Sequence, residues 1–179
     1  MISVITPTLN AALTLQACLD SVTACGCEHV IIDGGSTDGT LDIARRHDCE
    51  VIDAPGSGIY EAQNIGVAAA TGEWVHFLGA DDTLVEGAVD AVAEVISTAR
   101  EDWVRVMVSL GGSPSRYVNQ QQGFLYRKSL LEKYGGMDES VGLCADARFN
   151  ETLRGRGEPC LKIPVHFANF TLGANHASA

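Results

Sequence analysis

Two adjacent aspartates, Asp81 and Asp82, follow an apolar run at residues 74–78. Neighbouring carboxylates repel each other unless a cation or hydrogen-bond donors offset the repulsion. Mg²⁺ and Mn²⁺ take carboxylate oxygens as ligands and complete their coordination with water and substrate phosphates. The pair therefore indicates a metal site for a phosphate-bearing substrate. An equally simple interpretation is that one aspartate caps the helix expected from Leu84 and that solvent covers the other.

Two more polar segments come directly after apolar runs. They are residues 7–10, with the sequence Pro-Thr-Leu-Asn, and the loop at residues 33–40, which opens with Asp33. The glycines of this loop fit neither the P-loop nor the G-x-G-x-x-G pattern, so alone it predicts a tight turn capped by Thr37 or Asp38. Ligands of open α/β sheets lie beyond the carboxyl ends of the strands. We therefore expect both segments to line one site with the aspartate pair.

The elements that must hold these loops alternate between short apolar runs and helix-length segments, which is typical of a parallel α/β sheet. The pattern predicts strands at residues 2–6, 30–32, 51–52, 74–78, 103–110 and 161–165. It predicts helices at residues 15–22, 41–47, 61–70, 84–98, 129–134 and 145–154.

Three local patterns make sharper predictions. Ser129 and Glu132 form a capping-box pattern, and Gly135 is placed to end the short helix that follows it. Pro164 is tolerated only at the edge of a sheet, so residues 161–165 are expected to form an edge strand. Helical spacing of apolar residues predicts a buried stripe made of Leu15, Cys18, Leu19 and Val22.

The composition excludes several classes of protein. A length of 179 residues matches one domain, and 12 Lys+Arg against 23 Asp+Glu give a net charge of −11, the wrong sign for binding nucleic acid or anionic lipid. No apolar run approaches the roughly 20 residues of a membrane-spanning helix, and the N-terminus does not resemble a signal peptide, so a cytoplasmic protein is expected. The six cysteines lack zinc-site spacing, which predicts buried free thiols.

Taken together, these segments resemble the nucleotide-binding half of the family 2 glycosyltransferases in order and spacing. The motifs that carry the likeness lie at residues 2–10, 30–40, 58–66, 70–82, 122–128, 134–139 and 145–146, with Arg154 after them. The resemblance implies the GT-A fold, a Rossmann-like, mixed, mostly parallel central sheet with helices on both faces. It implies a single domain in which residues 1–100 bind a nucleotide sugar and residues 101–179 form a compact acceptor-side half.

The resemblance also implies an activity and the residues that carry it. Family 2 enzymes typically transfer a sugar from a nucleotide-diphosphate donor to an acceptor hydroxyl with inversion. By likeness, Asp82 is the ligand of Mn²⁺ or Mg²⁺ and Asp81 lies beside it, near the ribose or the metal. Asp33 corresponds to the carboxylate that accepts a hydrogen bond from uracil, which makes a UDP-sugar the expected donor. The remaining residues implied to bind the nucleotide are Pro7, Thr8, Asn10 and Asn64.

Asp146 is implied to be the catalytic base. An inverting displacement needs a carboxylate opposite the leaving group to take the proton of the attacking hydroxyl. Asp146 can do this only if the fold brings it across the cleft from Asp82. The simpler interpretations are that Asp146 forms an ion pair with Arg148 or caps a helix.

The sequence departs from the family at a few positions. Relatives often carry an acidic residue and Lys where this chain has Gly56 and Ser57, and often His where it has Gln121. The interval from Asp82 to Gln122 is short, so either the acceptor, a sugar or glycolipid hydroxyl, is small or a second subunit, such as the partner of a homodimer, completes the site. By analogy the protein acts in bacterial surface polysaccharide or glycolipid synthesis, in the cytoplasm or peripherally at the inner membrane face.

Two other functions remain open at this point. A catalytically silent nucleotide-sugar-binding or scaffold protein would fit the short acceptor region, although the four aspartates above argue against it. A sugar-1-phosphate nucleotidyltransferase would carry a Gly-rich loop with Lys or Arg after the first strand. Residues 7–10 carry no such charge, so this function ranks last.

Overall fold

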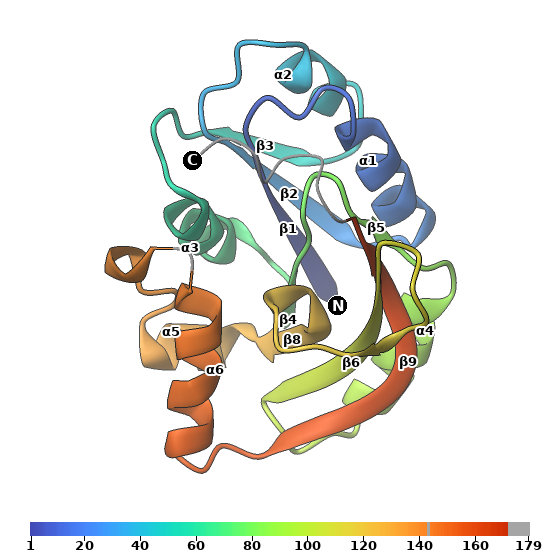
Figure 1. Ribbon diagram of the computed structural model, residues 1–179, viewed down its shortest axis with the longest axis vertical. Coiled ribbons are helices and arrows are strands. Elements are labelled where there is room, and N and C mark those ends of the chain that lie inside the picture. The colour runs from blue at the N-terminus through green and yellow to red at the C-terminus, as the bar shows by residue number, and fades with distance from the viewer. Residues whose placement is uncertain (143, 172–179) are drawn as a thin grey trace.

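The computed structural model describes residues 1–142 and 144–171, and within them a nine-stranded sheet forms the centre of the molecule (Figure 1). The strands lie in the order β3-β2-β1-β4-β8-β6-β9-β5, with β7 paired to β6. Their bounds are β1 Ile2–Thr8, β2 Glu28–Asp33, β3 Glu50–Asp53, β4 Trp74–Phe77, β5 Thr83–Leu84, β6 Trp103–Leu110, β7 Arg116–Tyr117, β8 Phe124–Arg127 and β9 Cys160–Phe170. The helices are α1 Leu15–Ala24, α2 Thr40–Ala44, α3 Ile59–Ala69, α4 Ala88–Ile96, α5 Lys128–Tyr134 and α6 Ala145–Gly155, with the 3₁₀ helices η1 Gln121–Gly123 and η2 Glu139–Val141.

Parallel pairing arranges the first half of the sheet. β1 pairs in parallel with β2 on one side and with β4 on the other, and β2 pairs in parallel with β3. The carboxyl ends of these strands therefore meet at one edge, where the polar loops begin. β8 lies antiparallel between β4 and β6, and β6 pairs in parallel with β9, so the sheet as a whole is mixed.

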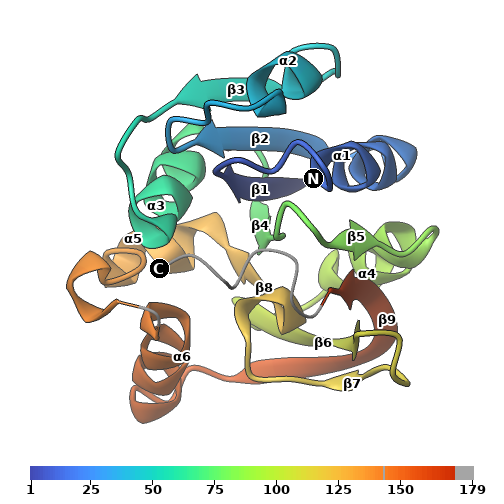
Figure 2. The same ribbon diagram turned by 45° about the horizontal axis from the view of Figure 1, so that its top comes forward.

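Hydrophobic clusters cover both faces of this sheet. Successive residues of a strand point to opposite faces, and in β1 Val4 joins one cluster while Ile5 joins the other. Residues of α1, α2 and α4 belong to the first cluster, and residues of α3, α5 and α6 belong to the second. Figure 2 shows α1 and α4 on one side of the strands and α3 and α6 on the other (compare Figure 1). The expected mixed sheet with helices on both faces is confirmed.

Two of the local predictions are confirmed. The expected stripe of α1 is buried completely, at Leu15, Cys18, Leu19 and Val22. Gly135 ends α5 in a left-handed conformation, with φ of 82°, which glycine adopts without steric cost.

The capping-box prediction is wrong. Helix α5 begins at Lys128, and Arg127 occupies its N-cap position without a side-chain hydrogen bond. Ser129 therefore lies inside the helix. The cause is tertiary, because β8 runs directly into α5 and Lys128 donates its backbone N–H to Glu73 before β4.

The helix expected at residues 84–98 is wrong at its start. Thr83 and Leu84 form β5, which pairs with the far end of β9 at Asn169 and Ala168. Helix α4 begins only at Ala88, after Gly87 with φ of 74°. Pairing with a distant strand thus overrides the local helical pattern.

The last strand is longer than expected. β9 extends to Phe170 and contacts both β6 and β5. Pro164 falls at an irregularity of the β6–β9 ladder, between the pairs formed by Lys162 and His166. In the described sheet, β9 is therefore not the edge strand, because β5 follows it, but β5 pairs only with Ala168 and Asn169 and leaves residues 161–165 paired on the β6 side alone. An irregular position suits a residue without a backbone N–H.

All six cysteines are free, as expected, but they are less buried than predicted. Cys18 is fully buried, whereas Cys144 is exposed and the others are half-buried. Among the described residues, no helix is long and apolar enough to cross a bilayer.

Candidate functional site

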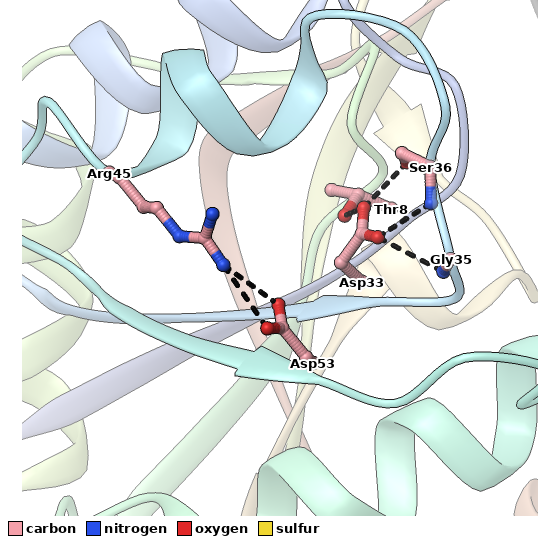
Figure 3. Close-up of polar contacts among 6 residues, drawn as sticks. All are labelled: Thr8, Asp33, Gly35, Ser36, Arg45 and Asp53. Atoms are coloured by element: carbon pink, nitrogen blue, oxygen red, sulfur yellow. Dashed lines mark hydrogen bonds and ion pairs between the residues drawn. The ribbon is translucent and has the colours of Figure 1, made fainter.

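Asp33, the last residue of β2, is 1% exposed, and its carboxylate accepts four hydrogen bonds (Figure 3). Oδ1 accepts the backbone N–H groups of Gly35 at 3.0 Å and Ser36 at 2.7 Å. Oδ2 accepts the hydroxyls of Thr8 at 3.0 Å and Ser36 at 2.6 Å. Burial alone would raise the pKa of Asp33, but these hydrogen bonds outweigh it and hold the pKa below its usual value. Asp33 is therefore a fixed anion at neutral pH.

Asn10 ties the loop after β1 to the loop after β2. It adopts a left-handed conformation with φ of 51°, which Asn tolerates better than most residues. Its backbone N–H donates to the Ser36 hydroxyl at 2.8 Å, and its Oδ1 accepts the Thr37 N–H at 2.9 Å. Pro7 pairs with Ile32 in the adjoining ladder. Four predicted nucleotide-binding residues, Pro7, Thr8, Asn10 and Asp33, are thus brought together.

The segment after β3 packs against the same loop. The N–H of Gly56 donates to the carbonyl of Gly34 at 2.9 Å, and a Cβ on Gly35 would lie 3.4 Å from Pro55. Gly35 has φ of 104°, so this close approach and this backbone both favour glycine. Ser57 keeps its hydroxyl buried and without a hydrogen-bond partner among the described residues.

Asp82 follows β4 and is 1% exposed. Its carboxylate accepts the N–H of Thr171 at 2.8 Å and of Gly79 at 3.3 Å, and the nearby side chain of Gln122 also favours its ionised form. Burial is the main reason that the pKa of Asp82 rises to about 6, and the charge of Asp81 adds to it. A nearby cation would offset both effects, since it favours the ionised form.

Asp81 and Asp82 converge over Gly79. A Cβ on Gly79 would lie 2.6 Å from Asp82 Oδ2 and 3.0 Å from Asp81 Oδ1. Neither aspartate caps α4, which begins at Ala88, so the simpler interpretation of the pair is wrong. No cluster of three or more His, Cys, Asp or Glu suited to a metal occurs in the described part of the chain. Two carboxylates alone do not complete the coordination of a divalent cation, so a cation held here would need phosphate or water as its other ligands.

Asp146 lies in the first turn of α6. Its Oδ1 accepts the Tyr60 hydroxyl at 3.2 Å, and its Oδ2 accepts the backbone N–H of Gln121 at 3.2 Å. Arg148 instead pairs with Asp138, at 3.7 Å between Nη1 and Oδ2, so the expected alternative of an Asp146–Arg148 ion pair is wrong. The helix-cap alternative is also wrong, because Cys144 is the N-cap residue and no side chain caps the helix.

The short helix η1 connects the two carboxylate centres. The backbone N–H of Gln121 donates to Asp146, and the side chain of the next residue, Gln122, faces Asp82 and helps to lower its pKa. The fold thus places Asp82 and Asp146, which are far apart in sequence, on either side of one short element. Gln122 is buried, and its Oε1 has no partner within the described residues.

The side chain of Asn64 is bound to a different segment, around Met137. Its Nδ2 donates to Met137 O and Glu139 Oε1, both at 2.9 Å, and its Oδ1 accepts the Met137 N–H at 2.8 Å. Both ends of the amide are occupied, so the structure gives no support to the expected nucleotide contact. Asn64 holds the segment that contains Met137 and Glu139.

Sequence reasoning missed Ser36, Tyr60 and Gln122. Ser36 stands three residues after Asp33, a spacing at which a hydroxyl often bonds back to an aspartate. Tyr60 and Gln122 belong to two of the family-like motifs, but only tertiary structure shows which carboxylate each contacts.

A hollow of about 430 Å³ opens at the opposite ends of β1 and β4. Its lining includes Cys25, Cys27, Trp74 and Arg127. The Arg127 guanidinium already pairs with Glu73 and with Asp102, the latter at 3.0 Å. The charge of the Arg127 guanidinium is therefore already compensated and is not free for an anionic ligand.

Comparisons with known proteins agree with this geometry. A model of the family described as "Glycosyl transferase family 2" matches residues 3–147. A PGL/p-HBAD biosynthesis glycosyltransferase of Mycobacterium tuberculosis is 47% identical to the chain, over 53% of the chain and 40% of the relative. An uncharacterized glycosyltransferase of the same organism is 35% identical, over 48% of the chain and 39% of the relative. The chain thus spans about two-fifths of the length of these curated relatives.

Solved structures share the fold at low sequence identity. S. aureus TarS in complex with UDP-GlcNAc superposes with a TM-score of 0.82 at 21% identity, over 99% of this chain and 61% of that one. The mannosyltransferase PcManGT from Pyrobaculum calidifontis, in complex with GDP-Man and Mn²⁺, superposes with a TM-score of 0.77 at 20% identity, over 98% of this chain and 58% of that one. With its GT-A architecture and a family match over most of its length, the chain belongs to glycosyl transferase family 2.

Proposed function

We propose that the chain carries the donor site and the base of a metal-dependent, inverting glycosyltransferase that uses a UDP-sugar. The observation that carries the proposal is the arrangement at η1. The backbone N–H of Gln121 donates to Asp146, and the side chain of the next residue, Gln122, faces Asp82 and favours its ionised form, so one element separates the carboxylate proposed as base from the carboxylate proposed as metal ligand.

The proposed uracil site is Asp33. Its two oxygens already accept four hydrogen bonds, about as many as a carboxylate can accept. Two of the donors are hydroxyls, on Thr8 and Ser36, which can rotate away, whereas the two backbone N–H groups are fixed. The ring N–H of uracil would therefore replace a hydroxyl at Oδ2. Adenine presents only an acceptor at its corresponding ring nitrogen, so Asp33 selects against it.

Asp81 and Asp82 are the proposed ligands of Mn²⁺ or Mg²⁺. When bound, the cation would neutralise the charge that builds on the departing diphosphate. PcManGT, a structural neighbour, is named as a complex with Mn²⁺, which supports a divalent metal without fixing the ion. The raised pKa of Asp82 adds support, since burying this carboxylate is costly without a cation.

Asp146 is the proposed base. The acceptor oxygen forms a bond to the anomeric carbon as the bond from that carbon to the diphosphate breaks, and Asp146 takes the hydroxyl proton. The acceptor is proposed to be a sugar or glycolipid hydroxyl, the class suggested by the relative named for glycolipid (PGL) biosynthesis. Because the chain spans about two-fifths of that relative, further sequence or a second copy is proposed to complete the acceptor site.

The direct test measures UDP release from UDP-glucose and from UDP-GlcNAc, with water as the acceptor, in the wild type and in Asp146→Asn. We expect release with Mn²⁺ and none with EDTA. Asp146→Asn should bind UDP within about twofold of the wild type but release it at least about 100-fold more slowly, because only the proton acceptor is lost.

Asp138→Asn is the matched control, because Asp138 pairs with Arg148, which lies on the same helix as Asp146. This variant should keep the wild-type rate. A full rate in Asp146→Asn would assign the base elsewhere. Loss of UDP binding in that variant would show that Asp146 holds the donor and would contradict its proposed role.

A further inference from the structure

One face of α3 contacts three separate segments of the second half of the chain. Tyr60, Gln63 and Asn64 stand at i, i+3 and i+4, so they share a face of the helix. Tyr60 reaches Asp146, and Gln63 Nε2 donates to Gln121 Oε1 at 2.7 Å. Asn64 holds the segment around Met137. Helix α3, which follows the loop packed on the Asp33 turn, therefore also fixes the surroundings of Asp146.

Tyr60 is built to donate a hydrogen bond at a fixed place. Its ring is 7% exposed and belongs to the hydrophobic cluster under α3 and α6. Burial, and then the charge of Asp146, raises the pKa of Tyr60 to about 12. The hydroxyl consequently keeps its proton at neutral pH and can act only as a donor to the carboxylate.

The two oxygens of Asp146 are held from different directions. Oδ1 accepts from the Tyr60 hydroxyl and Oδ2 from the Gln121 N–H, each at 3.2 Å. The Gln121 backbone is in turn buttressed by the contact of its side chain with Gln63. A carboxylate with one donor could rotate about its last side-chain bond, whereas two donors on separate oxygens fix its plane. A base must present a lone pair to the acceptor hydroxyl, so this plane matters for the reaction.

We infer that Tyr60 is a positioning residue that orients the proposed base, Asp146. The inference rests on the proposed function, because Asp146 has a base's role only there. Tyr60 acts through Asp146, so its effect belongs to the rate of transfer and not to donor binding.

The test compares Tyr60→Phe with Tyr134→Phe. Both substitutions remove one hydroxyl that donates to a carboxylate, since Tyr134 donates to Glu158 at 2.6 Å, away from η1. The assay measures UDP release from UDP-glucose and UDP-GlcNAc with Mn²⁺, calorimetric affinity for UDP, and the melting temperature. For Tyr60→Phe we expect kcat to fall about tenfold or more, with KM for the donor and UDP affinity within about twofold of the wild type. Tyr134→Phe should keep the wild-type kcat.

Several outcomes would overturn the inference. Equal kcat values for the two variants would show that the Tyr60 hydroxyl does not orient the base. A joint change of kcat, KM and melting temperature in Tyr60→Phe would show a structural role only. Asp146→Asn, measured alongside, separates the two claims, because full activity in that variant contradicts the proposed function itself. If Asp146→Asn is inactive and Tyr60→Phe is not impaired, only the inference fails.

Discussion

His76 makes folding stability depend on pH in a way that can be calculated. The side chain lies in β4 and is fully buried. Its Nδ1 lies 3.0 Å from the Phe124 carbonyl, so Nδ1 carries the proton, and its Nε2 has no partner within the described residues. The ring packs edge-on against Phe167, with centroids 4.9 Å apart. A second proton, on Nε2, would place a positive charge in this apolar setting, where no described residue accepts a hydrogen bond from Nε2.

Burial lowers the pKa of His76 from 6.5 to about 4, although the bond to Phe124 opposes the shift. Between pH 4 and 6.5 the unfolded chain therefore binds a proton that the folded chain does not. The contribution of His76 to the free energy of unfolding is fully present above about pH 6.5 and is lost as the pH falls toward 4. The difference of about 2.5 between the two pKa values corresponds to about 3 kcal/mol of the free energy of unfolding.

The assay is urea unfolding at pH 7 and at pH 4.5, for the wild type and for His76→Asn. Asparagine retains an N–H near the position of Nδ1 but does not titrate. The variant retains His29, whose pKa burial also lowers to about 4, so the difference in pH slope isolates His76. We expect the wild type to lose about 2 kcal/mol more than the variant over this interval. Parallel losses in the two proteins would refute the reasoning.

Two further predictions concern the site. Gly79→Ala should abolish Mn²⁺-dependent UDP binding while the protein stays folded, because the new Cβ would lie 2.6 Å from Asp82 Oδ2 and displace it; calorimetry that shows unchanged metal-dependent affinity would contradict this. Asp33→Asn should weaken UDP binding at least about tenfold and lower the free energy of unfolding by about 1–3 kcal/mol, because an amide cannot accept from all four donors. Asp53→Asn is its control, since Asp53 ends the neighbouring strand, is exposed and pairs only with Arg45 among the contacts in Figure 3; an equal effect of the two changes would remove the special role of Asp33.

The first half of the fold could be predicted because its signals are local. Buried strands such as β1 and the stripe of α1 follow from hydrophobic periodicity, and polar loops at strand ends placed Asp33 and Asp82 at one edge. β5 could not be predicted, because two residues become a strand only by pairing with β9. The start of α5 was missed for a similar reason, since β8 runs straight into it.

In the candidate site, too, local patterns could be predicted and contacts between distant segments could not. Types and spacing of residues identified the carboxylates, but not what holds them. The partners of Asp146 come from α3 and η1, and the partners of Asp82 include Thr171 after β9. These contacts join segments that are distant in sequence, so no local pattern encodes them. The nucleotide contact of Asn64 stays a prediction, and what the structure adds is that its amide holds the distant segment around Met137.

The measurement that tests the central claim most directly is calorimetric titration of the protein with UDP, GDP and ADP, first with Mn²⁺ and then with EDTA. If Asp33 reads the base through a ring N–H and Asp81 and Asp82 hold the metal, UDP will bind more tightly than ADP, whose ring nitrogen offers no proton, and EDTA will weaken UDP binding. Equal affinity for UDP and ADP, or UDP binding that EDTA leaves unchanged, would contradict the account.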